Sequence, residues 1–373
     1  MASLGRPDHD RWLPDALTGR LAEDIPDDVI GLILDRALHS PDPADEGWQR
    51  EDWGGEKIYS GDPLSHGINS ARGSAALTLG DLLVHDADGH RTALIEPSFE
   101  ALASDPSVAV RSCVAHLLAA GLRHARPSVI QVFPLLVDAP HELLATRPVE
   151  ELMVYVGFSD SELVEPVIER MLGSAIDEVR EAGGRLAAFA GLEFESGLLA
   201  DAVISEERDI RKGAAKICAH RLPVTADAAA ASDALKQFID DPDNEVRDAA
   251  AEVAGALRNR PLAPHEELIH ALLASAAFPD ALPQLLITLE QSTERVGGLI
   301  LATTRRFIDV FGGELSSISS RASADARHVG ELILRAFNQA PNSEARAATL
   351  DLIDELLAQA AYDLARLVGE AER

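Results

Sequence analysis

The chain has 373 residues, of which 46% are hydrophobic and 25% are charged, as in ordinary soluble folded proteins. Aromatic residues make up only 4%, and this scarcity favours closely packed helices of Ala, Leu and Val over a core built on large rings. The formal net charge of −29 repels phosphate backbones. It therefore argues against nucleic acid as a partner and favours a protein partner that carries a basic segment.

The opening residues, MASLGRPDHDRWLPD, lack the apolar core of a signal peptide. No run of the sequence approaches the ~18 apolar residues of a membrane span. Cys113 and Cys218 fall inside apolar helical patterns, so we interpret them as small buried hydrophobes, and two separate cysteines suit a reducing compartment. We expect a cytoplasmic protein that does not bind membranes.

Residues 1–64 are expected to form an N-terminal domain, a helical cap followed by an acidic loop that contains tryptophan. The clearest helix is predicted over residues 27–38, where apolar residues recur along one face. Repeat proteins need an atypical end unit with a polar outer face, and this is the interpretation that we favour for the segment.

Residues 40–66 are predicted to be a long loop, because Pro, Gly and Asp dominate and no apolar period survives. The loop nevertheless contains Trp48, Trp53 and Tyr59. Aromatic side chains in a polar loop act either as anchors for a partner or as staples that pack on neighbouring helices. Packing is the interpretation that we favour, and the three residues remain candidates for partner binding.

Residues 65–373 contain a repeated unit, in which a small or apolar residue and an arginine begin an amphipathic helix. From Val110 and from Ile210, apolar or small residues follow at the same offsets of 3, 4, 7, 8 and 12, which trace one stripe of an α-helix. The unit begins at Ala71-Arg72, Val110-Arg111, Val179-Arg180, Ile210-Arg211, Val246-Arg247 and Ala345-Arg346.

The spacing of these arginines is close to the period of helix-pair repeats. Arg72 and Arg111 are 39 residues apart, and Arg211 and Arg247 are 36 apart. Longer intervals leave room for one unmarked repeat around residues 148–158 and for two more before Arg346. First helices of the pairs are predicted at 91–103, 128–137, 162–172, 228–239, 264–274 and 281–290.

Asp-Pro turns precede two of the arginines, and they carry a resemblance to a known family. The segments DPSVAVR at 105–111 and DPDNEVR at 241–247 look like the turn within a HEAT repeat. The resemblance implies an all-α, right-handed superhelical solenoid of roughly seven to nine antiparallel helix pairs. It also implies a ladder of polar contacts between repeats, with the members Asp105, Arg111, Arg180, Arg211, Asp241, Arg247 and Arg346.

The arginines admit two interpretations. In the structural one, each guanidinium pairs with an aspartate or a carbonyl of the adjoining repeat. In the functional one, the arginines bind a carboxylate or phosphate, and Arg72 and Asn69 join the candidate partner-binding residues. The structural interpretation is favoured because each arginine recurs at a fixed offset, and Asn69 is interpreted as a helix cap.

The segment GINSARG at 67–73 resembles part of the helical C-terminal region of large bacterial STAND-type NTPases, including anti-phage defence proteins. That resemblance implies a sensor or a split partner of such a system, although this sequence carries no NTPase motif.

The sequence lacks the common motifs of catalytic sites. The sequence has no phosphate-binding G-x-x-x-x-G-K-[ST] loop, no G-x-G-x-x-G and no nucleophile elbow. His265 and His270 are five residues apart, which places them on different helical faces, whereas a zinc helix needs four. A calcium loop beginning at Asp86 would have its glycine, Gly89, in the wrong position. We expect no catalytic residue, no metal and no cofactor.

These observations favour a non-enzymatic protein-binding scaffold, adaptor or sensor. We expect it to be part of a bacterial multi-component system of the defence type. The alternative is a HEAT-like DNA-repair glycosylase or another nucleic-acid-binding solenoid, which the net charge opposes. A further alternative is a HEAT-like lyase or chaperone.

Overall fold

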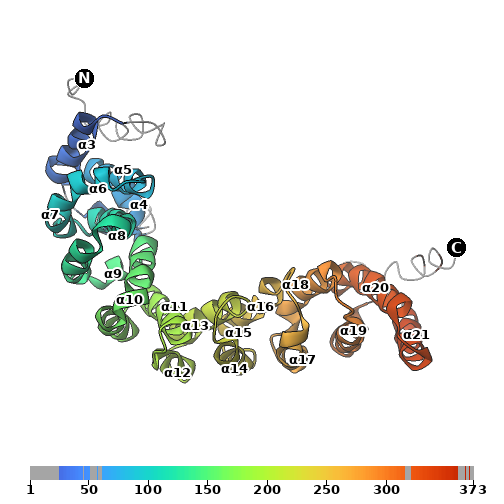
Figure 1. Cartoon of the computed structure of the whole chain (residues 1–373). Coiled ribbons are helices and arrows are strands. Elements are labelled where there is room, and N and C mark those ends of the chain that lie inside the picture. The colour runs from blue at the N-terminus through green and yellow to red at the C-terminus, as the bar shows by residue number, and fades with distance from the viewer. Residues whose placement is uncertain are drawn as a thin grey trace. The chain divides into compact units, whose positions relative to one another are not determined.

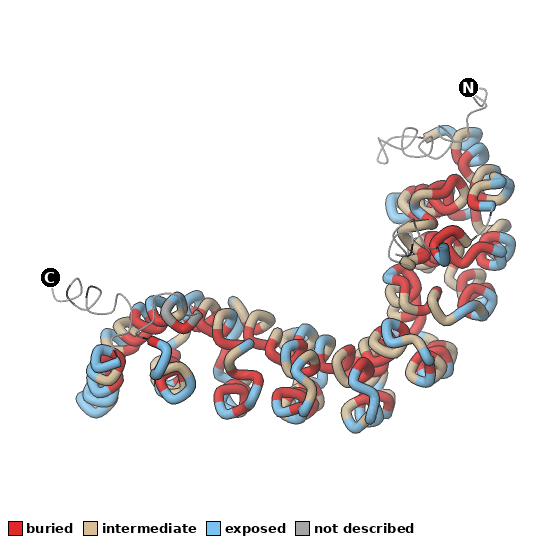
Figure 2. The backbone as a smooth tube through the Cα atoms, turned by 180° about the vertical axis from the view of Figure 1, so that it is seen from behind, coloured by how far each residue is buried: buried red, intermediate tan, exposed pale blue. Residues whose placement is uncertain are grey.

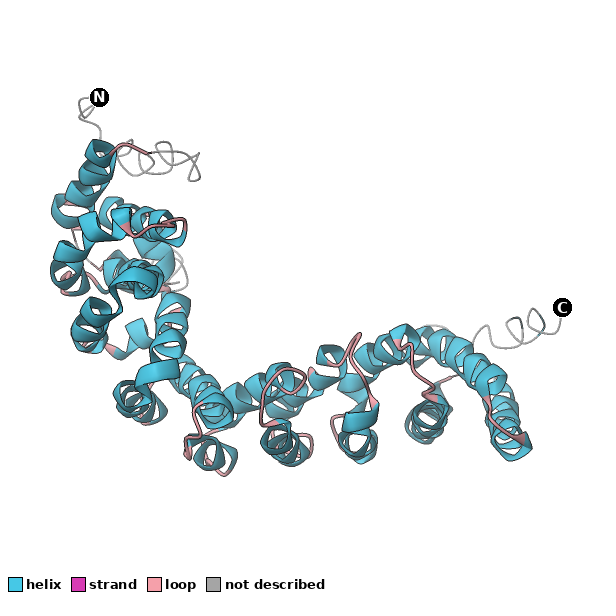
Figure 3. Ribbon diagram, in the orientation of Figure 1, coloured by secondary structure: helices cyan, strands magenta, loops and turns pink. Residues whose placement is uncertain are grey.

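The computed structural model describes residues 25–44, 46–50, 57, 61–315 and 321–359, together with residues 366 and 369. This part of the chain is built of helices joined by short connections (Figure 3). Contacts divide the chain into two compact units, Met1–Ala190 and Gly191–Arg373, here called unit 1 and unit 2. Each unit is a stack of helix pairs, so the predicted all-α solenoid is confirmed.

Unit 1 begins with the first helix pair, α3 and α5, and each later pair packs on the one before it. The second helices α5, α8 and α10 contact one another in chain order. The helices are α3 (Asp27–His39), α4 (Pro63–Ile68), α5 (Ala71–Val84), α6 (His90–Ile95), α7 (Phe99–Ala103), α8 (Val108–Val137), α9 (His141–Leu144), α10 (Arg147–Leu172) and α11 (Asp177–Glu193), the last of which spans the boundary between the units.

The two long helices of unit 1 each contain two helices of the repeat. The backbone leaves helical geometry at Ala125 in α8 (φ −130°, ψ 39°) and at Asp160 in α10 (φ −138°, ψ 50°). The break in α8 lies two residues before Pro127, whose ring nitrogen has no N–H to continue the hydrogen bonds of the helix. The part of each helix before the break is a second helix, and the part after it is the first helix of the next pair, as predicted for 128–137 and 162–172.

The helix predicted over residues 27–38 is α3, and it packs on α5. Two acidic residues in its first turn, Asp27 and Asp28, face the positive end of the helix dipole. The contact between α3 and α5 crosses the predicted domain boundary at residue 64, so α3 provides the first helix of a repeat within unit 1.

Close approach of backbones explains two glycines near the start of the repeats. A Cβ on Gly67 of α4 would lie 2.2 Å from the carbonyl oxygen of Ala109, and a Cβ on Gly73 of α5 would lie 2.2 Å from that of Gly67. Only glycine permits these contacts. The segment 67–73 therefore has a packing role at the junction of α4, α5 and α8.

Unit 2 arranges its helices in two layers, which Figure 1 shows along the yellow to red part of the chain. First helices α12, α14, α17 and α19 contact one another, and second helices α13, α15, α16, α18 and α20 do the same. The bounds are α12 (Leu198–Val203), α13 (Arg208–Arg221), α14 (Ala228–Phe238), α15 (Asn244–Ala251), α16 (Val253–Ala256), α17 (Glu266–Ala274), α18 (Phe278–Gln291), α19 (Gly297–Phe311), α20 (Arg321–Gln339) and α21 (Ser343–Ala358).

Two predicted helices of unit 2 occupy a different layer from the one expected. The segment 281–290 lies in α18, which packs between α16 and α20 and is therefore a second helix rather than a first one. The helix that contains Arg346 is α21, which contacts both α19 and α20 and follows a complete pair. Both errors arise because the apolar stripe of a helix gives its buried face but not its layer.

Buried residues lie where the two layers meet, as the red segments of Figure 2 show. The buried side chains are mostly Ala, Leu, Val and Ile, which fit the short distance between adjacent helices. Gly80 shows how tight this packing is, since a Cβ there would lie 2.4 Å from Cδ2 of His116 on the next second helix. The scarcity of aromatic residues thus follows from the architecture.

Candidate binding surface

Arg72, a candidate partner-binding residue in the sequence, instead binds the predicted ladder residue Asp105 of the next helix pair. Arg72 donates from Nε at 2.9 Å and from Nη2 at 3.3 Å to the two carboxylate oxygens, and from Nη1 at 2.8 Å to the carbonyl of Ser40. Asp105 is buried and also accepts the backbone N–H of Ser107 at 2.8 Å. We call this arrangement, an arginine that donates two bonds to the turn aspartate of the next pair, a rung.

Unit 2 contains a second rung with the same geometry. Arg211 donates from Nε at 2.7 Å and from Nη2 at 3.1 Å to Asp241, which accepts the backbone N–H of Asp243 at 2.8 Å. The hydrogen bond to Asp241 raises the pKa of Arg211. Both arginines are largely covered, so their hydrogen-bonding capacity is directed into the stack of repeats rather than toward solvent.

The other predicted ladder arginines bind carbonyls or stand apart. Arg111 donates to the carbonyls of Leu135, Leu136 and Asp138 at the end of α8. Arg247 donates to the carbonyls of its own turn, Asp241 at 2.7 Å and Pro242 at 3.1 Å.

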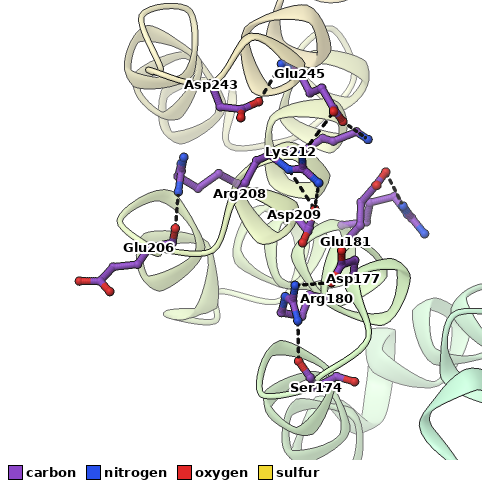
Figure 4. A network of polar contacts seen from close by, with 12 residues as sticks. Ser174, Asp177, Arg180, Glu181, Glu206, Arg208, Asp209, Lys212, Asp243 and Glu245 are labelled. Atoms are coloured by element: carbon purple, nitrogen blue, oxygen red, sulfur yellow. Dashed lines mark hydrogen bonds and ion pairs between the residues drawn. The ribbon is translucent and has the colours of Figure 1, made fainter.

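Arg180 also stays within its own turn, where it donates to the carbonyl of Ser174 at 2.9 Å and to Asp177 at 2.6 Å (Figure 4). Arg346 differs from all of these, because it is exposed and its guanidinium carbon lies 5.3 Å above the ring of Phe337. The difference arises because α21 follows a complete pair and is not a second helix.

Trp48 and Asn69, two of the predicted partner-binding residues that the structure describes, are engaged within the protein. Trp48 is buried and donates from its indole nitrogen to Glu46, whose other oxygen accepts the N–H of Val108 at 2.7 Å. Asn69 donates to the carbonyl of Ser65 at 2.8 Å at the end of α4, while Ser70 caps α5. Trp53 and Tyr59 lie outside the described residues.

A cavity of about 420 Å³ lies beside Trp48. Carboxylates of Asp62, Glu142 and Glu178 share its lining with Lys57, so it holds both signs of charge. Asp62 uses both of its oxygens to cap α4, accepting from Leu64 and Ser65. One of the carboxylates that line the cavity is therefore already engaged in a helix cap.

Two exposed aromatic residues on α10 form the surface that distinguishes unit 1. Tyr155 and Phe158 are three residues apart, and 52% and 57% of their areas are exposed. The ring of Phe158 meets that of Phe189 on α11 edge to face, with 5.9 Å between centroids and an angle of 88°. We call these three residues the aromatic surface.

Comparison of the repeats shows how unusual Phe158 is. Position nine after the start of the repeat lies on the side where neighbouring second helices approach closely, and the start in α10 is Val149. Five other second helices have glycine or alanine at this position, namely Gly80, Ala119, Ala188, Ala219 and Gly255. Packing therefore asks for a small residue, and α10 presents a phenylalanine to solvent instead.

Charged groups near the aromatic surface are paired with one another. Arg185 bridges Glu150, at 2.6 and 3.0 Å, and Glu181, at 3.2 Å. Burial raises the pKa of Glu150 even though Arg185 opposes the change. Arg126 binds Asp160 at 2.5 Å at the break in α10. These networks fix α10 and α11 and so hold the rings in place.

Neither cysteine offers reactive chemistry, since burial raises the pKa of Cys113 and of Cys218 to about 12. Within the described ranges, no group of three or more His, Cys, Asp or Glu residues is arranged to hold a metal ion. No helix in the part of the chain that the structure describes is long and apolar enough to cross a membrane.

No family model matches the sequence, and no curated protein matches it. Among solved structures, a chain of the Pds5–Scc1 complex, studied for its implications for cohesin function, is similar to this chain with 12% identity and a TM-score of 0.31. The match covers 92% of this chain and 63% of that one, so this chain spans less than two thirds of the length of its structural relative.

Proposed function

We propose that this chain is a non-enzymatic protein-binding scaffold, of the adaptor or sensor kind, which engages a partner through the aromatic surface of α10 and α11. The observation that carries the proposal is the exposure of Tyr155 and Phe158 on one helix, in a chain with few aromatic residues. Exposed aromatic side chains bury a large area at little cost in conformational entropy, and for this reason they dominate the binding energy of many interfaces.

The charge of the chain specifies the partner further. A net charge of −29 attracts a protein with a basic segment and repels nucleic acid. Association is then faster at low salt, because long-range attraction between exposed charges is screened as ionic strength rises.

The biological setting is a more specific part of the proposal. A cytoplasmic role in a multi-component bacterial system of the defence type rests on the resemblance of residues 67–73 to STAND-type regions. Gly67 and Gly73 in this segment also have the packing role described above, so the resemblance is supported by the sequence pattern alone.

The test is an affinity capture from source-cell lysate at low salt, with three versions of the full chain as bait. They are the unchanged chain, the double variant Tyr155→Ser/Phe158→Ser, and a control, Leu350→Ser/Leu357→Ser, which changes two exposed apolar residues on α21. We expect one protein to be retained by the unchanged chain and the control, to wash off with salt, and to be retained about tenfold less by the double variant. Equal retention by all three baits, or retention of nucleic acid alone, would contradict the proposal.

A further inference from the structure

An apolar groove lies on unit 2 between α12 and α14, the first helices of consecutive pairs, which lie side by side in Figure 1. Its volume is about 380 Å³. The floor and walls consist mainly of small and aliphatic side chains. These are Leu199, Ala200, Val203, Ile204, Ala230 and Ala234.

Local sequence explains why the groove is open. Alanines at positions 200, 230 and 234 place only a methyl group where longer side chains would fill the space between the helices. Ile204 ends α12 with 76% of its area exposed, the highest value among the large apolar residues that the structure describes. The groove thus leaves in water an aliphatic surface whose burial is favourable.

Carboxylates surround this apolar surface. Asp233 lines the groove with its side chain 74% exposed, and exposed Asp201 and Glu195 adjoin the lining residues Ala200 and Ser196 in the chain. The neighbouring Lys236 is held by Glu267 at 2.6 Å and by Asp233 at 3.5 Å, so two carboxylates share one cation. The edge of the groove is therefore acidic.

We propose that this groove binds an amphipathic, basic helix of a protein partner. Leucine or isoleucine side chains of that helix lie between α12 and α14, and its lysine or arginine side chains contact Asp201, Asp233 and Glu195. An apolar floor with a charged edge is the pattern by which grooves recognise one face of a helix. The inference rests on the proposed scaffold function, and it adds a second site, on unit 2, with a defined partner chemistry.

The experiment measures fluorescence anisotropy of two labelled synthetic peptides, each roughly four helical turns long, with the full chain. Both peptides carry leucines at helical spacing, and the remaining positions are lysine in one and glutamate in the other. Four proteins are compared: the unchanged chain, the groove-filling variant Ala200→Leu, the charge variant Asp233→Asn, and the control Ala347→Leu, which adds the same bulk at an exposed alanine of α21.

We expect the lysine peptide to bind the unchanged chain and the control equally, about tenfold more weakly to Ala200→Leu, and with a reduced salt dependence to Asp233→Asn. The glutamate peptide should not bind. Circular dichroism confirms that each variant is folded. Equal binding of the lysine peptide to all four proteins, or binding of the glutamate peptide, would overturn the groove as its site.

Two further outcomes separate the groove from the scaffold proposal. If Ala200→Leu converts a dimer of the unchanged chain to a monomer in sedimentation, the groove holds a second copy, and the basic helix is overturned. If the groove variants bind the lysine peptide normally while the lysate capture still retains its protein through Tyr155 and Phe158, the groove fails and the scaffold stands. If the lysine peptide binds in the groove but the lysate capture retains no protein, the groove stands and the scaffold proposal fails.

Discussion

The two units share the rung but differ in the surfaces that they expose. Arg72 with Asp105 in unit 1 and Arg211 with Asp241 in unit 2 have closely similar distances and the same capping bond. The aromatic surface belongs to unit 1 and the groove to unit 2. A feature that recurs at a fixed offset joins each repeat to the next, whereas a feature that departs from the repeat at one position is the better guide to binding.

The largest contrast is expected between two phenylalanines of unit 1. Phe133 on α8 is buried in the core, so Phe133→Ala should lower the free energy of unfolding by about 3–5 kcal/mol. Phe158→Ala removes a ring that is more than half exposed and should cost less than about 1.5 kcal/mol. Urea unfolding measures both, and lysate capture should be weakened by Phe158→Ala alone. A large loss of stability in Phe158→Ala would show that the ring serves packing.

The rungs provide the next test, because the same change should have the same effect in both units. Asp105→Ala and Asp241→Ala each leave a covered guanidinium without its partner and should cost about 3 kcal/mol. Asp177→Ala is the control, since Asp177 is 64% exposed and its pair with Arg180 should contribute less than about 1 kcal/mol. Hydrogen exchange reports the loss in each unit separately. A loss of stability in one unit alone would show that the two rungs do not contribute equally to stability.

A glycine comparison within unit 1 tests the tight packing of the helices. Gly67→Ala places a methyl group against the backbone oxygen of Ala109 and should cost about 2 kcal/mol. Gly31→Ala, in the middle of α3 with nothing within 4 Å of the new methyl group, should instead stabilise the protein by about 0.5–1 kcal/mol. Thermal unfolding of both variants checks the opposite signs, and destabilisation by Gly31→Ala would contradict the packing of α3.

The smallest effects on stability are expected from the protonation of two histidines. The hydrogen bond to Asp27 raises the pKa of His90 in unit 1, whereas burial lowers the pKa of His265 in unit 2. His90 therefore contributes stability at low pH that is lost as the pH rises through its raised pKa. His265 has the opposite effect, with stability lost as the pH falls from the ordinary pKa of histidine through its lowered pKa in the folded protein.

An NMR titration of the two imidazoles measures these shifts directly. Asp27→Asn should return the pKa of His90 toward its ordinary value and leave that of His265 unchanged. If the pKa of His90 does not move, the contact between α3 and α6 does not form in solution.

Much of the architecture was predictable because it repeats. The Asp-Pro turns and the stripe offsets predicted the helix pairs, and α3 was predicted to within one residue. Layer assignments for 281–290 and for the helix of Arg346 were wrong, because they depend on how pairs are counted across unmarked repeats. The stripe offsets also left out Phe158, although the glycine or alanine of five other repeats was a signal that could have found it. Trp48 could not be placed from sequence, since its burial depends on Glu46 bridging to α8.

Photo-crosslinking in the source cells tests the central claim most directly, with a benzophenone amino acid in place of Tyr155 and, in a control, in place of Leu350. Both positions are exposed, so the benzophenone group is accessible to other proteins at either position. We expect a crosslink from position 155 to one specific protein and none to that protein from position 350. The same adducts from both positions, or adducts with nucleic acid from position 155, would contradict the claim that α10 carries the binding surface.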